Sequence, residues 1–384
     1  MALKKIIKYI TKRGAMALYG LYASVQLPAL YDREHRQGNL SYLSESDYLV
    51  WKKAMLSLLR EHAVSGYGLR QRELFTAFAT AKIRVIRKRE GGDADTPIVV
   101  LCVKNDRRRI EMLVKHYRGL GVKHFAFLDN GSTDGTLEWM TEQEDIDLFA
   151  TDDTYSSFAK EAWINRIVGY YGFDRWYIVT DSDELIAYTG MEAHPLTDVT
   201  AYAVKNGISR IEALTLDMYA DAALFSEDPA QSDIRQKYCW MDSDSYIENK
   251  RQVGREMITA ITGGPRMRTM DVSTSLMKYP LVYFAPGTVS ANAHFQYPYS
   301  EINKCPCHFA ILHYKFLEED KKEYARRADK GSGFAFGGGY YRSYMNAAEG
   351  SSTFMYEGSL RYEDSKSLAQ LPIIKPIPFE ENEA

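Results

Sequence analysis

The stretch HFAFLDNGSTDGTLEWM, residues 124–140, decides which fold this sequence favours. An apolar and aromatic run leads into Asp129-Asn130-Gly131-Ser132 and Asp134-Gly135-Thr136, and a helix-like pattern follows. In an open α/β sheet, ligands bind outside the carboxyl ends of the strands, so a polar, glycine-rich strand exit indicates a binding site. An ordinary tight turn has a similar composition, and the surrounding segments are needed to separate the two interpretations.

Strand-like and helix-like segments alternate around this stretch. The strand-like runs are IVVLCV (98–103), IDLFAT (146–151) and WYIVTDSDEL (176–185). Helices are predicted over residues 106–121 and 157–171. Repeated strand–helix units with short links predict an α/β fold with a mostly parallel, Rossmann-like sheet flanked by helices. In such a sheet the exits at Asp129 and Asp181 lie at the same edge.

The chain divides into three expected parts. These are a helical extension (1–92), an α/β domain (93–320), and a C-terminal helix, Gly/Tyr-rich loop and tail (321–384). The extension follows from apolar residues at helical spacing over 44–62 and a second helical pattern over 70–88. EGGDADTP (90–97) has the composition of a linker.

Basic and apolar residues mix in the first 35 residues. A basic amphipathic helix in peripheral contact with an anionic membrane surface fits this pattern, and so does a helix packed on the protein itself. The uncharged segment 14–30 falls short of the ~20 strongly apolar residues that a spanning helix needs. The segment also lacks the features of a signal peptide.

Composition excludes several classes of protein. The 384 residues are 45% hydrophobic and 26% charged, which suits a folded globular chain. A net charge of −3 gives no basic excess for binding nucleic acid, so no nucleic-acid partner is expected. Four cysteines are too few and too scattered for a disulfide framework, which favours a reduced, cytoplasmic setting.

The second polar exit is VTDSDEL, which contains Asp181, Asp183 and Glu184. Three carboxylates within four residues repel one another unless a cation lies among them, and Mg²⁺ and Mn²⁺ take oxygen ligands. Alternate residues of an extended chain point the same way. The spacing therefore predicts that Asp181 and Asp183 converge on one ion while Glu184 points elsewhere.

The segments VVLCVKNDRRRIEMLVKHYRGLGVKHFAFLDNGSTDGT and WYIVTDSDEL together resemble the nucleotide-sugar half of a GT-A glycosyltransferase of the broad family 2-like group. The similarity continues through GGPRMR (263–268), YPLVYF (279–284) and CHFAILHYKF (307–316). It covers roughly residues 97–320. It implies a nucleotide-sugar half over 93–190 and an acceptor half over 191–320.

The resemblance also implies roles for individual residues. Contacts to the base and ribose of the donor are expected from Asn105, Asp106 and Asp129, in a turn shaped by Asn130, Gly131, Ser132 and Asp134. Asp181 and Asp183 resemble the Asp-x-Asp pair that holds a divalent cation, Mn²⁺ or Mg²⁺, against the donor diphosphate. The cation acts as a Lewis acid for the departing diphosphate. Glu184 is expected to be structural.

Basic residues further along the chain are candidates for binding the diphosphate. Arg266 and Arg268 share one face if GGPRMR is extended, and guanidinium groups suit phosphate oxygens. A solvated pair beside a turn is the alternative. Lys315 is a third candidate. His313 fits either a metal ligand or a hydrogen-bonded core residue, and His294 and His308 are weaker candidates.

An inverting transfer needs a base to take the proton of the acceptor hydroxyl. Asp217, at the end of a strand-like run, is the first candidate, and Glu227-Asp228 is the second. Cys305-Pro-Cys307-His308 lacks the second ligand pair that a structural zinc site needs. GSGFAFGGGYYRSY (331–344) lacks the Gly-Lys-Ser/Thr of a P-loop and fits a lid or a tail.

These observations favour a metal-dependent, inverting glycosyltransferase. It would transfer a sugar from a UDP-linked donor to a glycan or lipid-linked acceptor in surface polysaccharide or glycoconjugate synthesis. A dehalogenase-type phosphatase would carry its Asp-x-Asp after the first strand, and a nucleotidyltransferase would carry a glycine-rich basic loop there. The other alternative is a non-catalytic subunit of the same fold that binds glycan or nucleotide sugar.

Overall fold

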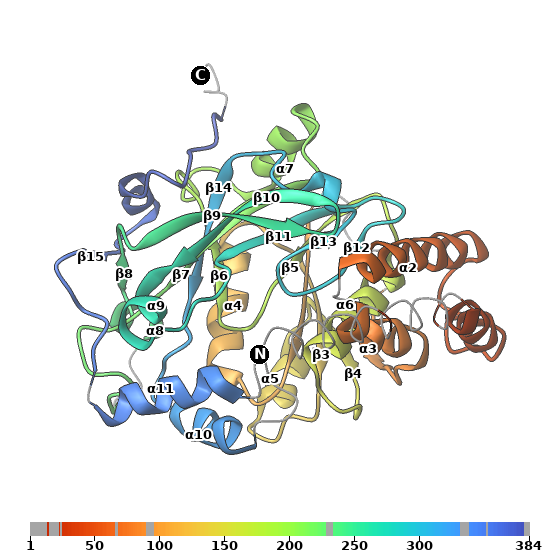
Figure 1. Ribbon diagram of the computed structural model, residues 1–384, viewed down its shortest axis with the longest axis horizontal. Coiled ribbons are helices and arrows are strands. Elements are labelled where there is room, and N and C mark those ends of the chain that lie inside the picture. Colours follow the sequence, from red (N-terminus) through yellow and green to blue (C-terminus); the bar gives the residue numbers. More distant parts are fainter. Residues whose placement is uncertain are drawn as a thin grey trace.

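The computed structural model describes residues 14, 23, 25–65, 68–89, 96–227, 233–330, 338–350 and 352–379. Among these residues, a nine-stranded sheet with the order β1-β4-β3-β2-β5-β11-β7-β14-β6 forms the centre of the molecule (Figure 1). Helices flank this sheet. The predicted α/β fold with a mainly parallel central sheet is therefore confirmed.

One half of the sheet is parallel. It consists of β4 (Ile146–Ala150), β3 (His124–Asp129), β2 (Ile98–Val103) and β5 (Arg175–Val179). The runs predicted at 98–103 and 124–129 match β2 and β3. They are almost continuously apolar because both faces of these strands are covered.

The other half is mixed. Its strands are β11 (Met277–Phe284), β7 (Arg210–Asp217), β14 (Cys307–His313) and β6 (Glu184–Ala187). β11 pairs antiparallel with both β5 and β7, and β7 pairs parallel with β14. Because β11 runs opposite to both β5 and β7, the strands β7 and β14 run in the same direction as β2, β3 and β5. The carboxyl ends of all five strands therefore meet at one edge of the sheet.

Helices cover the two faces because alternate residues of each strand point to opposite sides. Val99 and Leu101 of β2 join the core under α4 (Arg107–Gly119), α5 (Thr136–Glu142) and α7 (Leu196–Lys205). Ile98 and Val100 join the core under α2 (Glu45–Ser65), α3 (Gly68–Thr80) and α6 (Ser157–Tyr171). The predicted N-terminal helices thus share a core with the sheet. The domain boundaries stay a prediction.

The helix expected over 70–88 is partly wrong. α3 ends at Thr80, and β1 (Arg84–Arg87) follows it and pairs antiparallel with β4. The sequence RVIR contains the β-branched Val85 and Ile86, which suit a strand, and pairing covers the outer edge of β4. A helical pattern that continues into an edge strand cannot be separated from a longer helix by spacing alone.

The remaining described elements lie around the sheet (Figure 1). They are α8 (Ile234–Lys237), β8 (Trp240–Asp242), β9 (Tyr246–Val253), β10 (Glu256–Gly263), α9 (Gly264–Met270), β12 (Val289–Ser290), β13 (Gln296–Tyr297), η1 (Tyr299–Glu301), α10 (Asp320–Lys330), α11 (Gly339–Glu349), β15 (Ser359–Arg361) and η3 (Ser365–Gln370). α10 and α11 lie side by side, joined by contacts of Tyr324 with Tyr341 and Tyr344.

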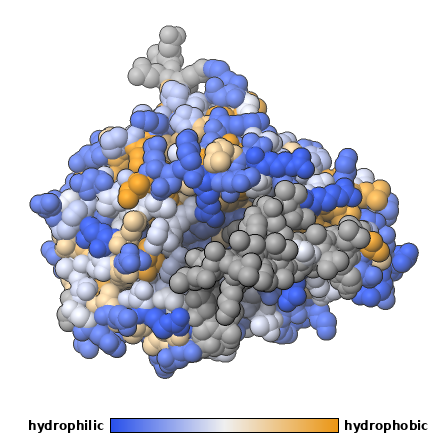
Figure 2. Space-filling model, in the orientation of Figure 1, coloured by the Kyte–Doolittle hydropathy of each residue, from blue (hydrophilic) through white to orange (hydrophobic). Residues whose placement is uncertain are grey.

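Several predicted features lie outside the described residues. These are the basic segment 1–13, most of the linker (90–95), Asp228, and the first part of the Gly-rich loop (331–337). Within the described part of the chain, none of the helices combines the length and the apolar character needed to cross a membrane. The described surface seen in Figure 2 is mostly hydrophilic, with small separate apolar groups, which is ordinary for a protein surface.

Candidate functional site

The exit of β3 is a tight turn organised by Asp129. Its Oδ2 atom accepts hydrogen bonds from the backbone nitrogens of Gly131 and Ser132, at 2.9 and 3.0 Å. Gly131 has a left-handed φ of 76°, which glycine adopts without a steric cost. The Oδ1 atom of Asp129 is buried, and no hydrogen-bond partner for it exists among the described residues. The turn thus keeps one unused acceptor at the sheet edge.

Asn105 and Ser132 join the exits of β2 and β3. The Oγ atom of Ser132 accepts from the backbone nitrogen of Asn105 at 2.9 Å. The Oδ1 atom of Asn105 accepts from the backbone nitrogen of Thr133 at 2.6 Å. These two hydrogen bonds hold the loop after β2 against the loop after β3. The donor contacts predicted for Asn105 and Ser132 remain predictions.

Asp134 and Asn130 hold the loop after β3 against the neighbouring elements. Asp134 accepts from the backbone nitrogens of Thr136 and Arg107, and so holds the first turns of α5 and α4. Asn130 is buried, and its Nδ2 atom donates to the carbonyl oxygens of Thr151 and Asp153 after β4. Both side chains build the edge of the sheet, and their contacts to a donor also remain predictions.

The chain turns between β5 and β6 rather than staying extended. The backbone nitrogen of Glu184 donates to the carbonyl oxygen of Asp181 at 3.2 Å, and Glu184 begins β6. The extended conformation assumed for Asp181 and Asp183 is therefore wrong, and the metal-binding role of Asp181 stays a prediction. The two carboxylates have different neighbours: Asp183 contacts His313, whereas Asp181 contacts two lysines.

Asp183, Glu184 and His313 form a group that fits a divalent cation. One ligand atom from each lies within 4.8 Å of the others. His313 is paired in the sheet with Glu184 of β6 on one side and with Asp217 of β7 on the other. The Oε2 atom of Glu184 is buried, and the described residues provide no hydrogen-bond partner for it. A donor set of carboxylates and one imidazole suits Mn²⁺ better than Mg²⁺, which prefers oxygen alone.

His313 lies between two carboxylates. Its Nε2 atom is 3.2 Å from Oδ2 of Asp183, and its Nδ1 atom is 2.7 Å from Oδ1 of Asp217. Burial alone would lower the pKa of His313, but the flanking carboxylates raise it. The turn between β5 and β6 is held against the end of β14, because the backbone nitrogen of Tyr314 donates to the carbonyl oxygen of Asp183 at 2.8 Å.

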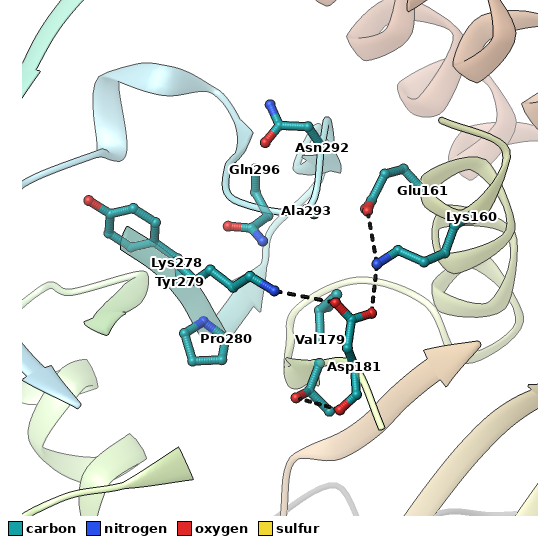
Figure 3. A pocket seen from close by; sticks show the side chains of 11 residues that line it. Lys160, Glu161, Val179, Asp181, Lys278, Tyr279, Pro280, Asn292, Ala293 and Gln296 are labelled. Carbon is teal, nitrogen blue, oxygen red and sulfur yellow. Dashed lines mark hydrogen bonds and ion pairs between the residues drawn. The ribbon is translucent and has the colours of Figure 1, made fainter. Parts of the chain in front are cut away.

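Asp181 is held between two ammonium groups (Figure 3). Lys160 of α6 lies 2.7 Å from Oδ1, and Lys278 of β11 lies 3.3 Å from Oδ2 and 2.5 Å from Oε1 of Glu184. Burial would raise the pKa of Asp181, but the two lysines hold it below its usual range. Sequence reasoning missed both lysines, because nothing in their local patterns indicates a partner so distant in the chain.

A small pocket adjoins this group. Asn292 and Gln296 line it opposite Asp181, together with both lysines (Figure 3). Its volume is about 10 Å³, which corresponds to roughly one water-sized group. The pocket itself is therefore too small for a whole sugar or nucleotide.

Arg266 and Arg268 lie on a helix, which contradicts the extended conformation expected for GGPRMR. Pro265 lies at the start of α9, where its fixed φ favours a helix. Residues two apart on a helix do not share a face. Arg266 donates to Asp217 at 2.7 Å, whereas Arg268 pairs with Asp242 at 2.9 Å. The diphosphate contacts of both arginines stay predictions.

Lys315 follows β14 and is half-buried, with its ammonium group 5.7 Å from the centre of the Tyr324 ring. Burial would lower its pKa, but Tyr341, Tyr344 and Asp183 raise it, so the side chain is a cation at neutral pH. The predicted contact of Lys315 with the donor diphosphate stays a prediction. The described part of the Gly-rich segment forms the start of α11, whose tyrosines supply this environment.

Arg109 is a buried residue that sequence reasoning missed, because the run DRRR does not show which arginine points inward. Its guanidinium pairs with Asp106 at 3.1 Å and with Asp320 of α10. Its Nε atom donates to the carbonyl oxygen of Tyr314 at 2.9 Å. Asp106 also accepts from the hydroxyl of Ser182. Arg109 therefore connects the exits of β2, β5 and β14.

The Cys-Pro-Cys-His segment shows other partners. Cys305 donates to the carbonyl oxygen of Arg210, and His308 contacts the carbonyl oxygen of Lys375 at 2.8 Å. His294 contacts the carbonyl oxygen of Met277 at 2.9 Å. In the described part of the chain, the group of possible metal ligands contains none of these residues.

A scan against protein-family models and a search of curated proteins return no match for this sequence. Among solved structures, the chain is similar to the mannosyltransferase PcManGT from Pyrobaculum calidifontis in complex with GDP-Man and Mn²⁺, with 13% identity and a TM-score of 0.25 over 42% of this chain and 47% of that chain. It is also similar to residues 1–349 of TarS from S. aureus, with 11% identity and a TM-score of 0.28 over 66% and 70% of the two chains.

This chain therefore spans about half the length of the mannosyltransferase. Scores this low leave the function to be inferred from the residues of the site.

Proposed function

We propose that this protein is a metal-dependent glycosyltransferase that uses a nucleotide-diphosphate sugar as donor and a glycan or lipid-linked molecule as acceptor. The observation that carries the proposal is the convergence of Asp183, Glu184 and His313 at the sheet edge. The exits carrying Asp106 and Asp129 lie at the same edge. The sequence resemblance to GT-A enzymes supports the same function.

The residues present fit a bound Mn²⁺ ion. Asp183 and His313 would hold it, and the buried Oε2 atom of Glu184, which has no partner among the described residues, would be a third ligand. The ion would supply Lewis-acid stabilisation of the departing diphosphate. Asp129 and Asp106 would bind base and ribose, and the ammonium group of Lys315 would contact the diphosphate. UDP is the proposed nucleotide.

Asp217 is an unfavourable base in this geometry. Burial would raise the pKa of Asp217, but Arg266 and His313 lower it to about 2. Its two oxygens already accept from these residues. An effective base has a pKa closer to the operating pH, so Asp217 as the base, and the inverting outcome that depends on it, stay predictions.

The proposal is tested by donor turnover. The purified protein is incubated with UDP-, GDP- and ADP-linked sugars, with Mn²⁺ or with a chelator, and release of nucleoside diphosphate is measured. We expect Mn²⁺-dependent release from one donor class, lost in Asp183→Ala. Asp198→Ala, which removes a half-exposed carboxylate of α7, is the control and keeps the activity.

A second candidate is a non-catalytic subunit that binds nucleotide sugar. It is favoured by one observation: the first candidate base, Asp217, is occupied by Arg266 and His313. Such a subunit would bind the donor with Mn²⁺ but release no diphosphate, either alone or with acceptor glycans. Cytoplasmic location is also a proposal. Contact of the N-terminal segment with anionic membrane is a further proposal, which is tested by vesicle binding of the chain with and without residues 1–35.

A further inference from the structure

We infer that Asp217 is a positioning residue, which orients His313 so that its Nε2 atom faces Asp183 and can bind a divalent cation. The inference rests on the metal site of the proposed function. Asp217 and His313 are paired residues of the adjacent parallel strands β7 and β14. The backbone nitrogen of Met218, next to Asp217, also donates to the carbonyl oxygen of His313 at 2.9 Å. The two side chains are thus held together by the sheet itself.

Asp217 determines which nitrogen of His313 carries a proton. A carboxylate only accepts hydrogen bonds, so the Nδ1 atom of His313, 2.7 Å from Oδ1, donates to it. In the neutral imidazole this leaves the lone pair on Nε2, which lies 3.2 Å from Asp183. Carboxylates that fix metal-binding histidines in this manner hold the ring and its tautomer.

Arg266 makes the arrangement testable. Its Nε atom donates to Oδ2 of Asp217 at 2.7 Å, so both oxygens of the carboxylate are in use. In Asp217→Asn, one oxygen becomes an NH₂ group. Arginine cannot accept a hydrogen bond, so the amide oxygen faces Arg266 and the NH₂ group faces Nδ1 of His313. Nδ1 then has to accept, the proton moves to Nε2, and the metal-binding lone pair is lost.

A second substitution removes this constraint. In the double variant Asp217→Asn/Arg266→Met, the amide has no arginine to satisfy and can turn its oxygen towards Nδ1. The tautomer with a free Nε2 is then restored. Because removing the unpaired buried arginine can also restore a damaged fold, circular dichroism of both variants separates the two causes. The inference requires that Asp217→Asn loses metal binding while its fold stays intact.

Asp242 provides a matched control. It is a fully buried aspartate of β8 that pairs at 2.9 Å with Arg268 of α9, the helix that also carries Arg266. Its other contacts are to the hydroxyls of Tyr219 and Ser245, without a histidine. Asp242→Asn therefore perturbs a comparable ion pair without changing the imidazole.

The experiment is a titration of the full chain with Mn²⁺ alone, followed by electron paramagnetic resonance with detection of nitrogen coupling to the ion. We expect the natural protein to bind Mn²⁺ with a histidine nitrogen signal that His313→Ala abolishes. Asp217→Asn is expected to lose the signal and about 10- to 100-fold in affinity. The double variant recovers both, and Asp242→Asn keeps both.

The inference is overturned if Asp217→Asn keeps the affinity and the nitrogen signal of the natural protein. It is also overturned if the natural protein binds Mn²⁺ without nitrogen coupling from His313, or does not bind Mn²⁺ at all. If Asp217→Asn does not fold, nitrogen NMR of the natural protein with Cd²⁺ decides: a proton on Nδ1 of His313 supports the inference, and metal on Nδ1 overturns it. None of these measurements needs nucleotide or turnover. Turnover of the donor without nitrogen coupling from His313 contradicts this inference alone. Nitrogen coupling without turnover of any donor contradicts only the proposed function.

Discussion

The ammonium group of Lys278 lies 2.5 Å from Oε1 of Glu184, and the same group reaches Oδ2 of Asp181 at 3.3 Å. Lys160 completes the cluster on the other side of Asp181. Buried carboxylates of this kind are tolerated because each has a cation beside it. Two lysines from separate elements thus make possible the acidic turn that carries Asp183.

Removing Lys278 is expected to destabilise the fold. Lys278→Met leaves the carboxylates of Glu184 and Asp181 short of a cation, which costs roughly 3–5 kcal/mol in the free energy of unfolding. The measurement is urea unfolding followed by circular dichroism. Lys304→Met is the control, because Lys304 is 54% exposed and pairs with Glu301 at the surface, where a pair contributes about 1 kcal/mol or less. Equal losses in the two variants would contradict the buried-cluster account.

The turn at the exit of β3 is expected to depend on Gly131. Its φ of 76° costs a residue with a Cβ atom about 1–2 kcal/mol, so Gly131→Ala lowers the free energy of unfolding by this amount. An added Cβ would meet only Nζ of Lys104, at 3.9 Å, so crowding contributes little. Gly119→Ala, in α4, is the control. Its added Cβ meets nothing within 4 Å, and it is expected to stabilise by about 0.4–1 kcal/mol. A neutral Gly131→Ala would show that the left-handed turn is not required.

Asp147 is expected to make stability depend on pH in the acid range. Burial would raise the pKa of Asp147, but hydrogen bonds from His124, Tyr171 and Arg89 lower it. A lowered pKa in the folded state gives stability that is present above the unfolded value of about 3.9 and is lost as pH falls through the lowered pKa.

Asp147→Asn lacks this contribution. The natural protein is therefore more stable than the variant at pH 6, by roughly 2 kcal/mol, and the difference shrinks as the pH approaches 2. Urea unfolding at several pH values measures it. Asp198→Asn, at a half-exposed position, is the control with a smaller difference at pH 6. A difference for Asp147→Asn that stays constant down to pH 2 would refute the assignment.

The parallel half of the sheet could be predicted because its strands are uninterrupted apolar runs that end at polar residues. This is why Ile98–Val103 and His124–Asp129 match the structure at both ends. The meeting of the two acidic exits followed from parallel topology alone. His313 was recognised as a candidate ligand because it is a polar residue in an apolar strand, and β14 brings it beside Asp183.

Contacts between distant elements could not be predicted. Lys160 and Lys278 come from α6 and β11, and their shared partner Asp181 depends on the register of β11 against β5. Glu184 was expected to point away because an extended chain was assumed, whereas a turn places it in β6 beside His313. The helix at 264–270 was missed because two glycines and a proline usually indicate a loop.

The central claim is that a nucleotide diphosphate binds at the sheet edge through a cation held by Asp183. The most direct measurement is calorimetric titration of the full chain with UDP, GDP, CDP and ADP, each with Mn²⁺ and again with chelator. The account predicts that one nucleotide, UDP, binds with Mn²⁺ only, and that Asp183→Ala loses this binding while Asp198→Ala keeps it. Binding that is unchanged by chelator or by Asp183→Ala, or no binding of any of the four, would contradict it.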